Sequence, residues 1–214
     1  MKKIIISSLL FGLFYNSCAQ KNPKNTQLEL KPIEVNSNNI HKAYFASGCF
    51  WCVEAIYESI IGVQDVVSGY SGGDTNDPTY GLVNTKLTGH AETIEVIYNP
   101  DEITFSNLLD VYFGSQNISQ INGQGPDMGP QYRSIIFYQN DNQKKIINAK
   151  INQIEGSTEV NVAAEVYPFR KFWVAEKYHQ DFKKNNPNHP YIKNISNPRF
   201  KNFKFKFEDL VKDE

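Results

Sequence analysis

Two cysteines three residues apart, Cys49 and Cys52, are the side chains of this sequence best suited to do chemistry. The alternating run at residues 42–47 predicts a strand before them, and the apolar periodicity of residues 53–61 predicts a helix after them. Cys49 is therefore expected at a helix N-terminus, where unpaired N–H groups and the positive end of the helix dipole favour an anion. Such an environment lowers the pKa of a thiol and populates the nucleophilic thiolate. Cys52 lies one helical turn further on, so a second sulfur is within reach.

A Cys-x-x-Cys pair has several meanings, and the neighbouring residues distinguish them only in part. A structural zinc site needs four ligands, whereas this sequence has no second such pair, and its histidines at positions 90, 179 and 189 are scattered. A thioredoxin-like exchange site also follows a strand and opens a helix. However, Phe50 and Trp51 are unlike the small or proline-containing dipeptide of such sites. A purely structural pair also stays open.

The first 40 residues differ in character from the rest of the chain. A basic start is followed by an apolar run at residues 4–14 that is too short to span a membrane, and this order is typical of a secretory signal. Cys18 stands where a bacterial lipoprotein signal carries its acylated cysteine, although an ordinary cleaved signal is the alternative. We therefore expect a signal peptide at residues 1–17, lipidation at Cys18 and a flexible tether at residues 18–40. The protein would be exported and anchored by its lipid to a bacterial membrane, in the cell envelope or periplasm.

The bulk composition indicates one globular domain, expected at residues 41–214, because the chain has 214 residues of which 40% are hydrophobic. A formal net charge of -1 gives no reason to expect a nucleic-acid partner. With Cys18 lipidated, one close pair of cysteines remains, so the chain is not a disulfide-stapled scaffold and the pair is expected to do chemistry. We expect the domain to be a monomer.

Strand and helix patterns are mixed along this domain, which favours an α/β or α+β fold in two layers. Long loops are expected at residues 71–89 and 114–130, and loops of this length in compact domains are usually functional or disordered. The tail from residue 198 has four alternating phenylalanines and is expected along the surface. Further strands are predicted at residues 63–70, 93–98, 134–138 and 161–166, and further helices from residue 104 or 106 to 113, from 141 to 156 and from 175 to 184.

Several short motifs stand in an order that resembles one family. They are Gly48-Cys49-Phe50-Trp51, Gly69-Tyr70-Ser71-Gly72-Gly73, Pro78-Thr79-Tyr80, Gly89-His90-Ala91-Glu92, the run from Gln124 to Ser134, and Ala175-Glu176-Lys177-Tyr178-His179-Gln180. With them, the sequence resembles the A-type peptide methionine sulfoxide reductases from residue 44 to residue 191. The resemblance implies a two-layer α/β (α+β) sandwich around a mixed β-sheet. It also implies reduction of the S epimer of methionine sulfoxide, free or in proteins, with no bound metal or cofactor and with an external dithiol as reductant, either a thioredoxin-like protein or dithiothreitol.

The resemblance also assigns the chemistry. Cys49 would attack the sulfoxide sulfur as a thiolate, and Glu92 would give the oxygen a proton as the S–O bond breaks. A carboxyl group beside aromatic side chains is expected to have a raised pKa and to keep its proton. The products would be methionine and a sulfenic acid on Cys49, which a second thiol must resolve.

Five residues would bind the substrate by the same resemblance. Tyr80 and Tyr132 would donate hydrogen bonds to the sulfoxide oxygen, and Asp127 would hold that polar network. Phe50 and Trp51 would form the pocket for the S-methyl group. Judged without the resemblance, the two tyrosines are ordinary half-buried side chains and Trp51 is a core residue.

The sequence departs from the family in a way that affects recycling, because no cysteine lies beyond Cys52. Many relatives use a C-terminal cysteine to resolve the sulfenic acid. We expect a Cys49–Cys52 disulfide after each turnover, since positions i and i+3 of a helix have Cβ atoms about 5–6 Å apart and a frayed first turn can distort to close the bridge. The alternative is that Cys52 is buried filler and that an external thiol reduces the sulfenic acid directly.

Smaller departures, at residues 116–118 and Gly123, fall in the second long loop. Two other functions remain as alternatives for the whole protein. One is an exported thioredoxin-like thiol–disulfide oxidoreductase, which would not need Glu92 or Tyr132. The other is a lipoprotein that binds methionine-rich peptides in the aromatic pocket without catalysis.

Overall fold

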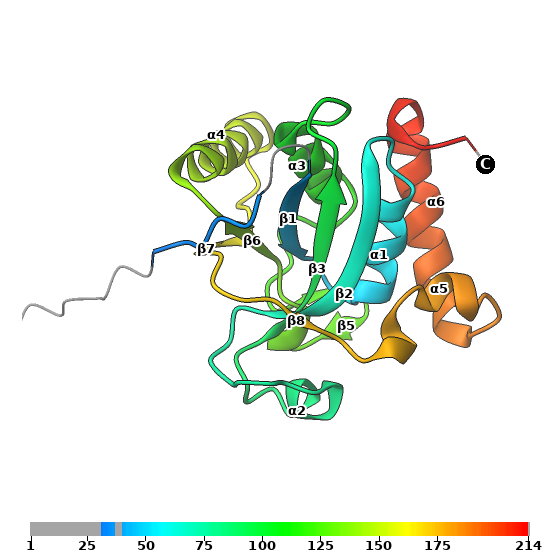
Figure 1. Cartoon of the computed structure of the whole chain (residues 1–214). Coiled ribbons are helices and arrows are strands. Elements are labelled where there is room, and N and C mark those ends of the chain that lie inside the picture. The colour runs from blue at the N-terminus through cyan, green and yellow to red at the C-terminus, as the bar shows by residue number, and fades with distance from the viewer. Residues whose placement is uncertain (1–30, 37–39, 214) are drawn as a thin grey trace, which may run out of the picture.

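A six-stranded mixed β-sheet forms the centre of the domain (Figure 1). This computed structural model describes residues 31–36 and 40–213. The strand order is β7-β6-β1-β3-β2-β8, in which β6 and β7 are parallel and the other neighbouring pairs are antiparallel. The strands are β1 (His41–Ala46), β2 (Val63–Ser71), β3 (Ala91–Tyr98), β6 (Ile135–Tyr138), β7 (Glu165–Pro168) and β8 (Trp173–Val174). The predicted mixed sheet is therefore confirmed.

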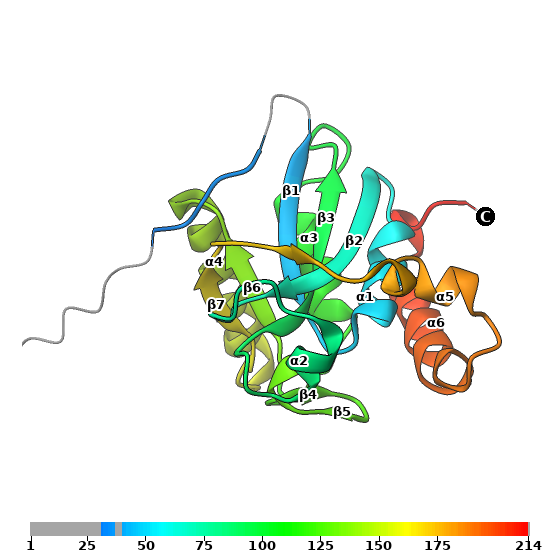
Figure 2. The ribbon, with the colours of Figure 1, turned by 60° about the horizontal axis from the view of Figure 1, so that its bottom comes forward.

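Helices cover one face of this sheet and complete the predicted two-layer α/β architecture. They are α1 (Phe50–Glu58), α3 (Phe105–Gly114), α4 (Asp141–Thr158) and α6 (Asn197–Lys206). Side chains of β1 alternate between the layers: Ala43 and Phe45 belong to the core beneath the helices, and Tyr44 and Ala46 to a smaller cluster on the opposite face. Tyr44 stacks on Phe169 with 3.8 Å between ring centroids, so the segment that leads to β8 covers this opposite face, across which it runs in Figure 2.

Helix ends follow the chemistry of the capping side chains. Thr104 caps α3 with a capping box, so the helix is capped at the first of the two predicted positions, residue 104 rather than 106. The helix α4 starts at Asp141 as predicted, and Asn140 caps it, because the Asn140 side chain accepts the Gln143 N–H at 2.9 Å. The helix also continues past Gly156 and ends where Glu159 adopts the left-handed conformation, with φ of 56°.

The two long loops each contain short regular elements. The first holds α2 (Tyr80–Asn84), and the second holds a hairpin of β4 (Gly123–Gln124) and β5 (Asp127–Met128). The predicted strand at residues 161–166 is displaced, since β7 pairs with β6 only from Glu165 onward. Residues just before it are held by the second loop instead, through the bond from the Ala163 N–H to the Ile118 carbonyl at 2.7 Å.

The predicted helix at residues 175–184 is wrong. A 3₁₀ turn at Lys177–His179 is followed by the one-turn α5 (Phe182–Asn185). Asp181 lies between them with φ of 51°, a left-handed conformation that interrupts helical hydrogen bonding. The Gln180 side chain bonds to both the N–H and the carbonyl of Ser68 in β2, so contacts with the sheet replace the helix.

The C-terminal tail is a helix rather than an alternating surface segment. In α6 the phenylalanines at 200, 203 and 207 fall at the i, i+3, i+7 spacing of one helical face. Phe203 is 1% exposed within the core, whereas Phe205, outside that face, is 88% exposed. This buried face packs α6 against α1, so the tail stands directly beside Cys52.

The predicted signal peptide and Cys18 lie outside the described residues, as does most of the predicted tether. Within residues 31–36, the Ile33 N–H donates to the Phe169 carbonyl at 2.9 Å and the Val35 N–H to the Gln139 side chain at 3.0 Å. Across the ranges that the structure describes, no helix has the length and apolar character needed to cross a membrane.

Candidate active site

Cys49 occupies the N-cap position of α1, directly after β1. Its backbone is extended, with φ of -61° and ψ of 123°, and its carbonyl accepts the Cys52 N–H at 3.1 Å. The turn depends on Gly48, which has φ of 78° and whose added Cβ would lie 2.5 Å from the Cβ of Gln124. The predicted position of Cys49 between strand and helix is therefore confirmed.

Glu92 approaches the Cys49 turn from β3, the strand that pairs with β1. It lies in β3 opposite Tyr70 of β2, is 2% exposed, and accepts the N–H of Phe50 at 3.0 Å. Burial raises the pKa of Glu92 to about 8, although the bond from Phe50 acts in the opposite direction. A protonated carboxyl group therefore stands beside the first residue of the helix that carries the thiols.

The pKa values of the two thiols are shifted in opposite directions. Burial, followed by the hydrogen bond to Cys52, raises the pKa of Cys49 well above its ordinary value, so the expectation of a lowered pKa at Cys49 is wrong. The hydrogen bond from Cys49 lowers the pKa of Cys52 to about 6, and the charge of Arg199 adds to this effect. The Arg199 charge thus favours the charged form of Cys52, whereas burial disfavours the charged form of Cys49.

An aromatic cluster around His179 brings together three of the predicted substrate-binding residues. Trp51 stacks on Phe182 with 3.6 Å between centroids, and its indole N–H donates to His179 Nδ1 at 3.0 Å. The His179 ring lies 4.8 Å from the ring of Phe50 and 4.5 Å from that of Tyr80. Burial lowers the pKa of His179, so the ring is neutral, and since an indole N–H can only donate, Nε2 carries the ring proton.

Glu176 holds this cluster in place through hydrogen bonds. It was not predicted as a site residue from the sequence. Its carboxylate accepts the N–H of Tyr80 at 2.8 Å and the hydroxyl of Tyr70 at 2.9 Å, and lies 3.9 Å from His179 Nε2. These bonds hold the start of α2 against the sheet. The motif at residues 175–180 was part of the family resemblance, but nothing in its spacing indicated that a carboxylate would orient Tyr80.

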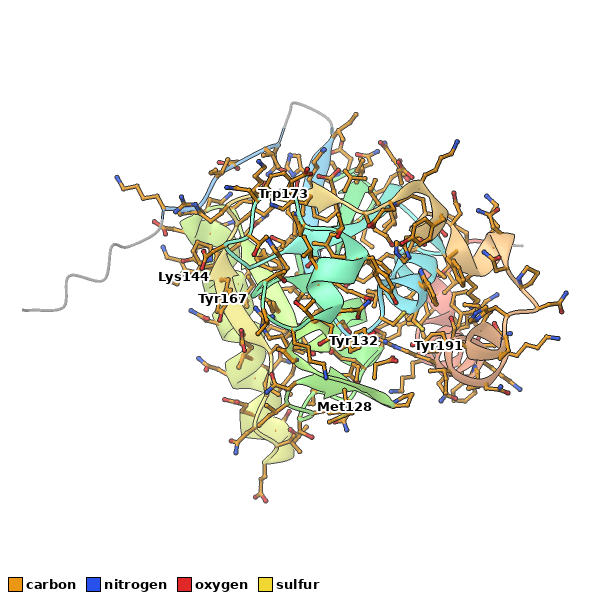
Figure 3. All side chains as sticks on the ribbon, turned by 90° about the horizontal axis from the view of Figure 1, so that it is seen from below. Met128, Tyr132, Lys144, Tyr167, Trp173 and Tyr191 are labelled. Carbon is orange, nitrogen blue, oxygen red and sulfur yellow. The ribbon has the colours of Figure 1, made fainter. Side chains whose placement is uncertain are left out.

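A second group of polar residues lies on the Cys52 side. The Tyr191 hydroxyl donates to Asp127 Oδ2 at 2.6 Å, and the Cys52 sulfur contacts the same hydroxyl at 3.7 Å. Tyr132 ends a 3₁₀ turn just after β5, and burial raises its pKa. Seen from below, Tyr132 and Tyr191 lie on the face that carries Met128 of the β4–β5 hairpin (Figure 3). Tyr191 is a further residue that sequence reasoning missed.

Arg199 of α6 joins the tail to the catalytic turn. Its guanidinium donates to the carbonyl and hydroxyl of Ser47 at 3.1 and 3.0 Å and to the Ser115 carbonyl at 3.0 Å. It therefore holds the end of β1 against the end of α3, immediately before Gly48. The expectation that the tail lies on the surface concealed this role, whereas a helical interpretation of the tail phenylalanines indicates an inward-facing Arg199.

Comparison with known proteins gives one consistent result. Residues 41–210 match the family model described as peptide methionine sulfoxide reductase. A peptide methionine sulfoxide reductase of Pasteurella multocida is 42% identical over 171 residues, which are 80% of this chain and 98% of that protein. One from Synechocystis is 38% identical over 208 residues, which are 96% of this chain and 97% of that protein.

Solved structures agree with these sequence matches. Mxr1 of Saccharomyces cerevisiae in reduced form superposes with a TM-score of 0.67 at 31% identity, covering 73% of this chain and 91% of that one. Methionine sulfoxide reductase A of Corynebacterium diphtheriae superposes with a TM-score of 0.64 at 27% identity, covering 74% and 83%. These matches favour neither the thioredoxin-like nor the peptide-binding alternative. The chain therefore belongs to the peptide methionine sulfoxide reductase family, as a thiol-dependent reductase of methionine sulfoxide.

Proposed function

We propose that Cys49 and Glu92 together reduce the S epimer of methionine sulfoxide, free or within oxidised proteins and peptides. The observation that carries this proposal is the Glu92 carboxyl group, which is bonded to the N–H of Phe50, the residue after Cys49, and has a pKa of about 8. Such a group keeps its proton at neutral pH and can give it to the departing oxygen. The Cys49 thiolate bonds to the sulfoxide sulfur as Glu92 protonates the oxygen and the S–O bond breaks. The hydroxyl passes to the Cys49 sulfur as the new S–S bond breaks, so methionine leaves with that electron pair and Cys49 becomes a sulfenic acid.

The aromatic residues on either side of the thiol orient the substrate. Phe50 and Trp51 present apolar surface for the S-methyl group, and the stacking of Trp51 on Phe182 keeps that surface in place. Burial raises the pKa of both Tyr80 and Tyr132, so both keep their O–H groups as donors to the sulfoxide oxygen. Asp127 supports the site indirectly, because its carboxylate accepts the hydrogen bond of the Tyr191 hydroxyl.

Recycling uses Cys52. The described chain has two free cysteines, Cys49 and Cys52, which hydrogen bond to each other. Cys52 attacks the sulfenic sulfur, water leaves, and a Cys49–Cys52 disulfide forms. An external dithiol, such as a thioredoxin-like protein or dithiothreitol, then returns both thiols to the reduced state.

The test of this mechanism is a pair of cysteine variants. The full chain is mixed with each epimer of methionine sulfoxide and dithiothreitol, and methionine is quantified. We expect turnover with the S epimer, none in Cys49→Ser, and accumulation of a dimedone-reactive sulfenic acid on Cys49 in Cys52→Ser. Substantial turnover in Cys49→Ser would refute the nucleophile assignment. Unchanged recycling in Cys52→Ser would refute the disulfide but leave the reduction step standing.

We also propose that the protein is exported and anchored to a bacterial membrane by lipid on Cys18. The support is the sequence alone: a basic start, a short apolar run and a cysteine at the cleavage position. Cell fractionation of the wild type and of Cys18→Ala tests it. We expect the wild type in the membrane fraction and Cys18→Ala in the soluble exported fraction, and a soluble wild type would refute the anchor.

A further inference from the structure

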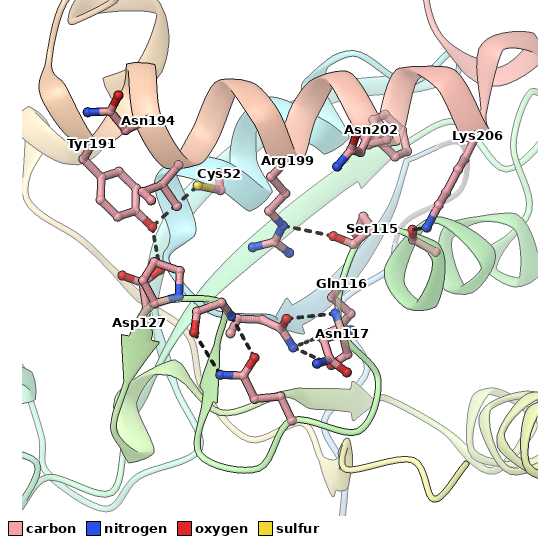
Figure 4. Close-up of a pocket in the computed structure, with 17 residues that line it drawn as sticks. Cys52, Ser115, Gln116, Asn117, Asp127, Tyr191, Asn194, Arg199, Asn202 and Lys206 are labelled. Carbon is pink, nitrogen blue, oxygen red and sulfur yellow. Dashed lines mark hydrogen bonds between the residues drawn. The ribbon is translucent and has the colours of Figure 1, made fainter. Parts of the chain in front are cut away.

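A cavity of about 450 Å³, lined by both polar and apolar side chains, opens onto Cys52 from the side of α6 (Figure 4). Cys52 is among the residues that line it, and Cys49 is not. Cys49 is buried beside Phe50, whose N–H donates to Glu92. The sulfur that lines the cavity is therefore that of Cys52. We propose that this cavity binds a small thiol that carries a carboxylate, such as a cysteine-containing di- or tripeptide, and directs its sulfur to Cys52 of the oxidised enzyme.

This inference rests on the proposed Cys49–Cys52 disulfide and names the reductant class that the described site accepts. The volume is the first argument. Ligand pockets for small molecules span about 300–1,000 Å³. A cavity of about 450 Å³ lies within this range and suits a thiol of tripeptide size.

The charge of one wall is the second argument. Ile195, Arg199, Asn202 and Lys206 follow one another at four-, three- and four-residue spacing, so they share one face of the C-terminal helix. Arg199 stands near Cys52, whose thiolate its charge favours, and Lys206 lies about 10 Å further along the helix. The wall therefore has a cation at the sulfur end and a second cation at a distance that suits the carboxylate of an extended small peptide.

The opposite wall is neutral and rich in amides. Gln116, Asn117, Gln120 and Gln124 line it, and they bond among themselves and to nearby carbonyls, as from Gln124 Nε2 to the Asn117 carbonyl at 2.7 Å. On the helix wall, the Asn202 side chain forms no hydrogen bond within the described part of the chain and is left to bond a ligand. Amide donors and acceptors match the peptide groups of a cysteinyl peptide.

A single carboxylate in the cavity wall opposes these cations. Asp127 lies at the Cys52 end, where its Oδ2 receives the Tyr191 hydroxyl at 2.6 Å. The Tyr191 hydroxyl therefore partly compensates the charge of Asp127. Lys206 is exposed, and within the described residues its ammonium group donates one hydrogen bond, to the Gly114 carbonyl at 3.2 Å. The free positive charge at the far end is the feature that selects an anionic thiol over a neutral one.

The exchange balances as two thiol–disulfide steps. The small thiolate attacks the Cys52 sulfur, the Cys49–Cys52 bond breaks, and Cys49 leaves with the electron pair and takes up the proton that the small thiol released. A second small thiolate attacks the mixed disulfide on Cys52. Cys52 leaves as a thiolate, and the small thiol is released as its own disulfide. Two electrons pass from two small thiols to the enzyme, and no other reactant is needed.

The test compares two thiols that differ only in charge. The full chain is oxidised to the Cys49–Cys52 disulfide with diamide, so that no sulfoxide turnover is required. Reduction by the peptide N-acetyl-Cys-Gly-Gly and by its C-terminal amide is followed, each rate normalised to thiolate concentration, because an extended tripeptide spans the roughly 10 Å from the sulfur end of the wall to Lys206. We expect the acid to react at least fivefold faster in the wild type, with the preference decreasing at high salt. The mixed disulfide should map to Cys52.

The matched variants lie on the same helix. Lys206→Glu should abolish the preference for the acid and leave the rate with the amide unchanged. Lys201→Glu makes the same charge change at an exposed position that does not line the cavity, and should leave both rates unchanged. Equal rates for the two thiols, no effect of Lys206→Glu, or a mixed disulfide on Cys49 would overturn the inference alone. Failure of diamide to form the Cys49–Cys52 disulfide would overturn both this inference and the proposed recycling.

Discussion

Replacing Glu92 by glutamine tests the proton donor directly. The amide keeps an oxygen that can accept the N–H of Phe50, which Glu92 accepts at 3.0 Å, but it cannot release a proton to the sulfoxide oxygen. Loss of a general acid slows a reaction by about 10²- to 10⁴-fold, or about 3–5 kcal/mol in the activation barrier. We expect a loss of this size in the single-turnover formation of methionine at pH 6, where Glu92 of the wild type is protonated.

The pH dependence provides a second measure of the same group. With a pKa of about 8, Glu92 loses its proton as the pH rises through 8, so the wild-type rate should fall on an alkaline limb that Glu92→Gln lacks. The ionisation of Glu92 also determines how the free energy of unfolding changes with pH. Below pH 4.5, folded and unfolded chains both hold the proton; between pH 4.5 and 8 only the unfolded chain releases it, so the free energy of unfolding falls as the pH rises.

The size of that fall can be worked out from the pKa. Between pH 5.5 and 8.5, the buried Glu92 should reduce the free energy of unfolding by about 3 kcal/mol, or about 6–12 °C in Tm for a domain of this size. Glu92→Gln should lack this component. Thermal unfolding of both proteins at the two pH values measures the difference, in which the contributions of all other titrating groups cancel.

Glu54 supplies the matched control for these experiments. It is 1% exposed and burial raises its pKa to about 8, but its hydrogen-bond partner is the Ser68 hydroxyl of β2 rather than the turn that carries Cys49. Glu54→Gln should therefore change the pH dependence of stability in the same way and leave the alkaline limb of the rate intact. An alkaline limb that persists in Glu92→Gln, or that disappears equally in Glu54→Gln, would refute the assignment of Glu92 as the acid.

Three further substitutions test the structure around the thiols. Gly48→Ala should lower the free energy of unfolding by about 1–3 kcal/mol in urea titrations, because φ of 78° strains an alanine and its Cβ would meet Gln124 at 2.5 Å; an unchanged midpoint would contradict this. Phe203→Ala should cost about 3–5 kcal/mol by the same measurement, since Phe203 is 1% exposed. Trp51→Ala should raise KM for the S sulfoxide more than it lowers kcat, and steady-state kinetics with a greater loss in kcat would exclude a binding role.

Local patterns were sufficient to predict the segment that carries the chemistry. The alternation before Cys49 and the apolar spacing after it are properties of neighbouring residues, and the resulting strand, turn and helix are as expected, although α1 starts and ends three residues before the predicted 53–61. β2 and β3 were also predicted within two residues, because buried antiparallel strands keep their own apolar signature. The motif order then provided the family and, through it, Glu92.

The errors arise where distant residues decide the conformation. Gln180 bonds to Ser68 more than a hundred positions away, and this contact with the sheet ends the helix that residues 175–184 would otherwise form. The tail phenylalanines fit both an alternating and a helical spacing in part, and only packing against α1 distinguishes them. The error on the pKa of Cys49 has the same origin. The helix terminus, which lowers a thiol pKa, can be predicted from neighbouring residues, whereas the burial that raises it depends on the whole fold, which leaves Cys49 only 6% exposed.

The raised pKa of Cys49 leads to a last prediction, because the nucleophile must be a thiolate. Interaction with Cys49 lowers the pKa of the neighbouring Cys52 thiol to about 6, so we infer that Cys52 accepts the Cys49 proton as Cys49 attacks. The second proton comes from Glu92, and when Cys52 resolves the sulfenic acid both protons leave in one water.

If Cys52 is this base, Cys52→Ser should slow even the first turnover at pH 7, by tenfold or more, because serine does not ionise and burial keeps the Cys49 thiol protonated. The single-turnover rate of the variant should rise about tenfold per pH unit as Cys49 itself ionises, whereas the wild-type rate should not. Rapid-quench measurement of methionine from pH 6 to 9 distinguishes this role from resolution alone. A first turnover in Cys52→Ser that matches the wild type at pH 7 would show that Cys49 loses its proton without help from Cys52.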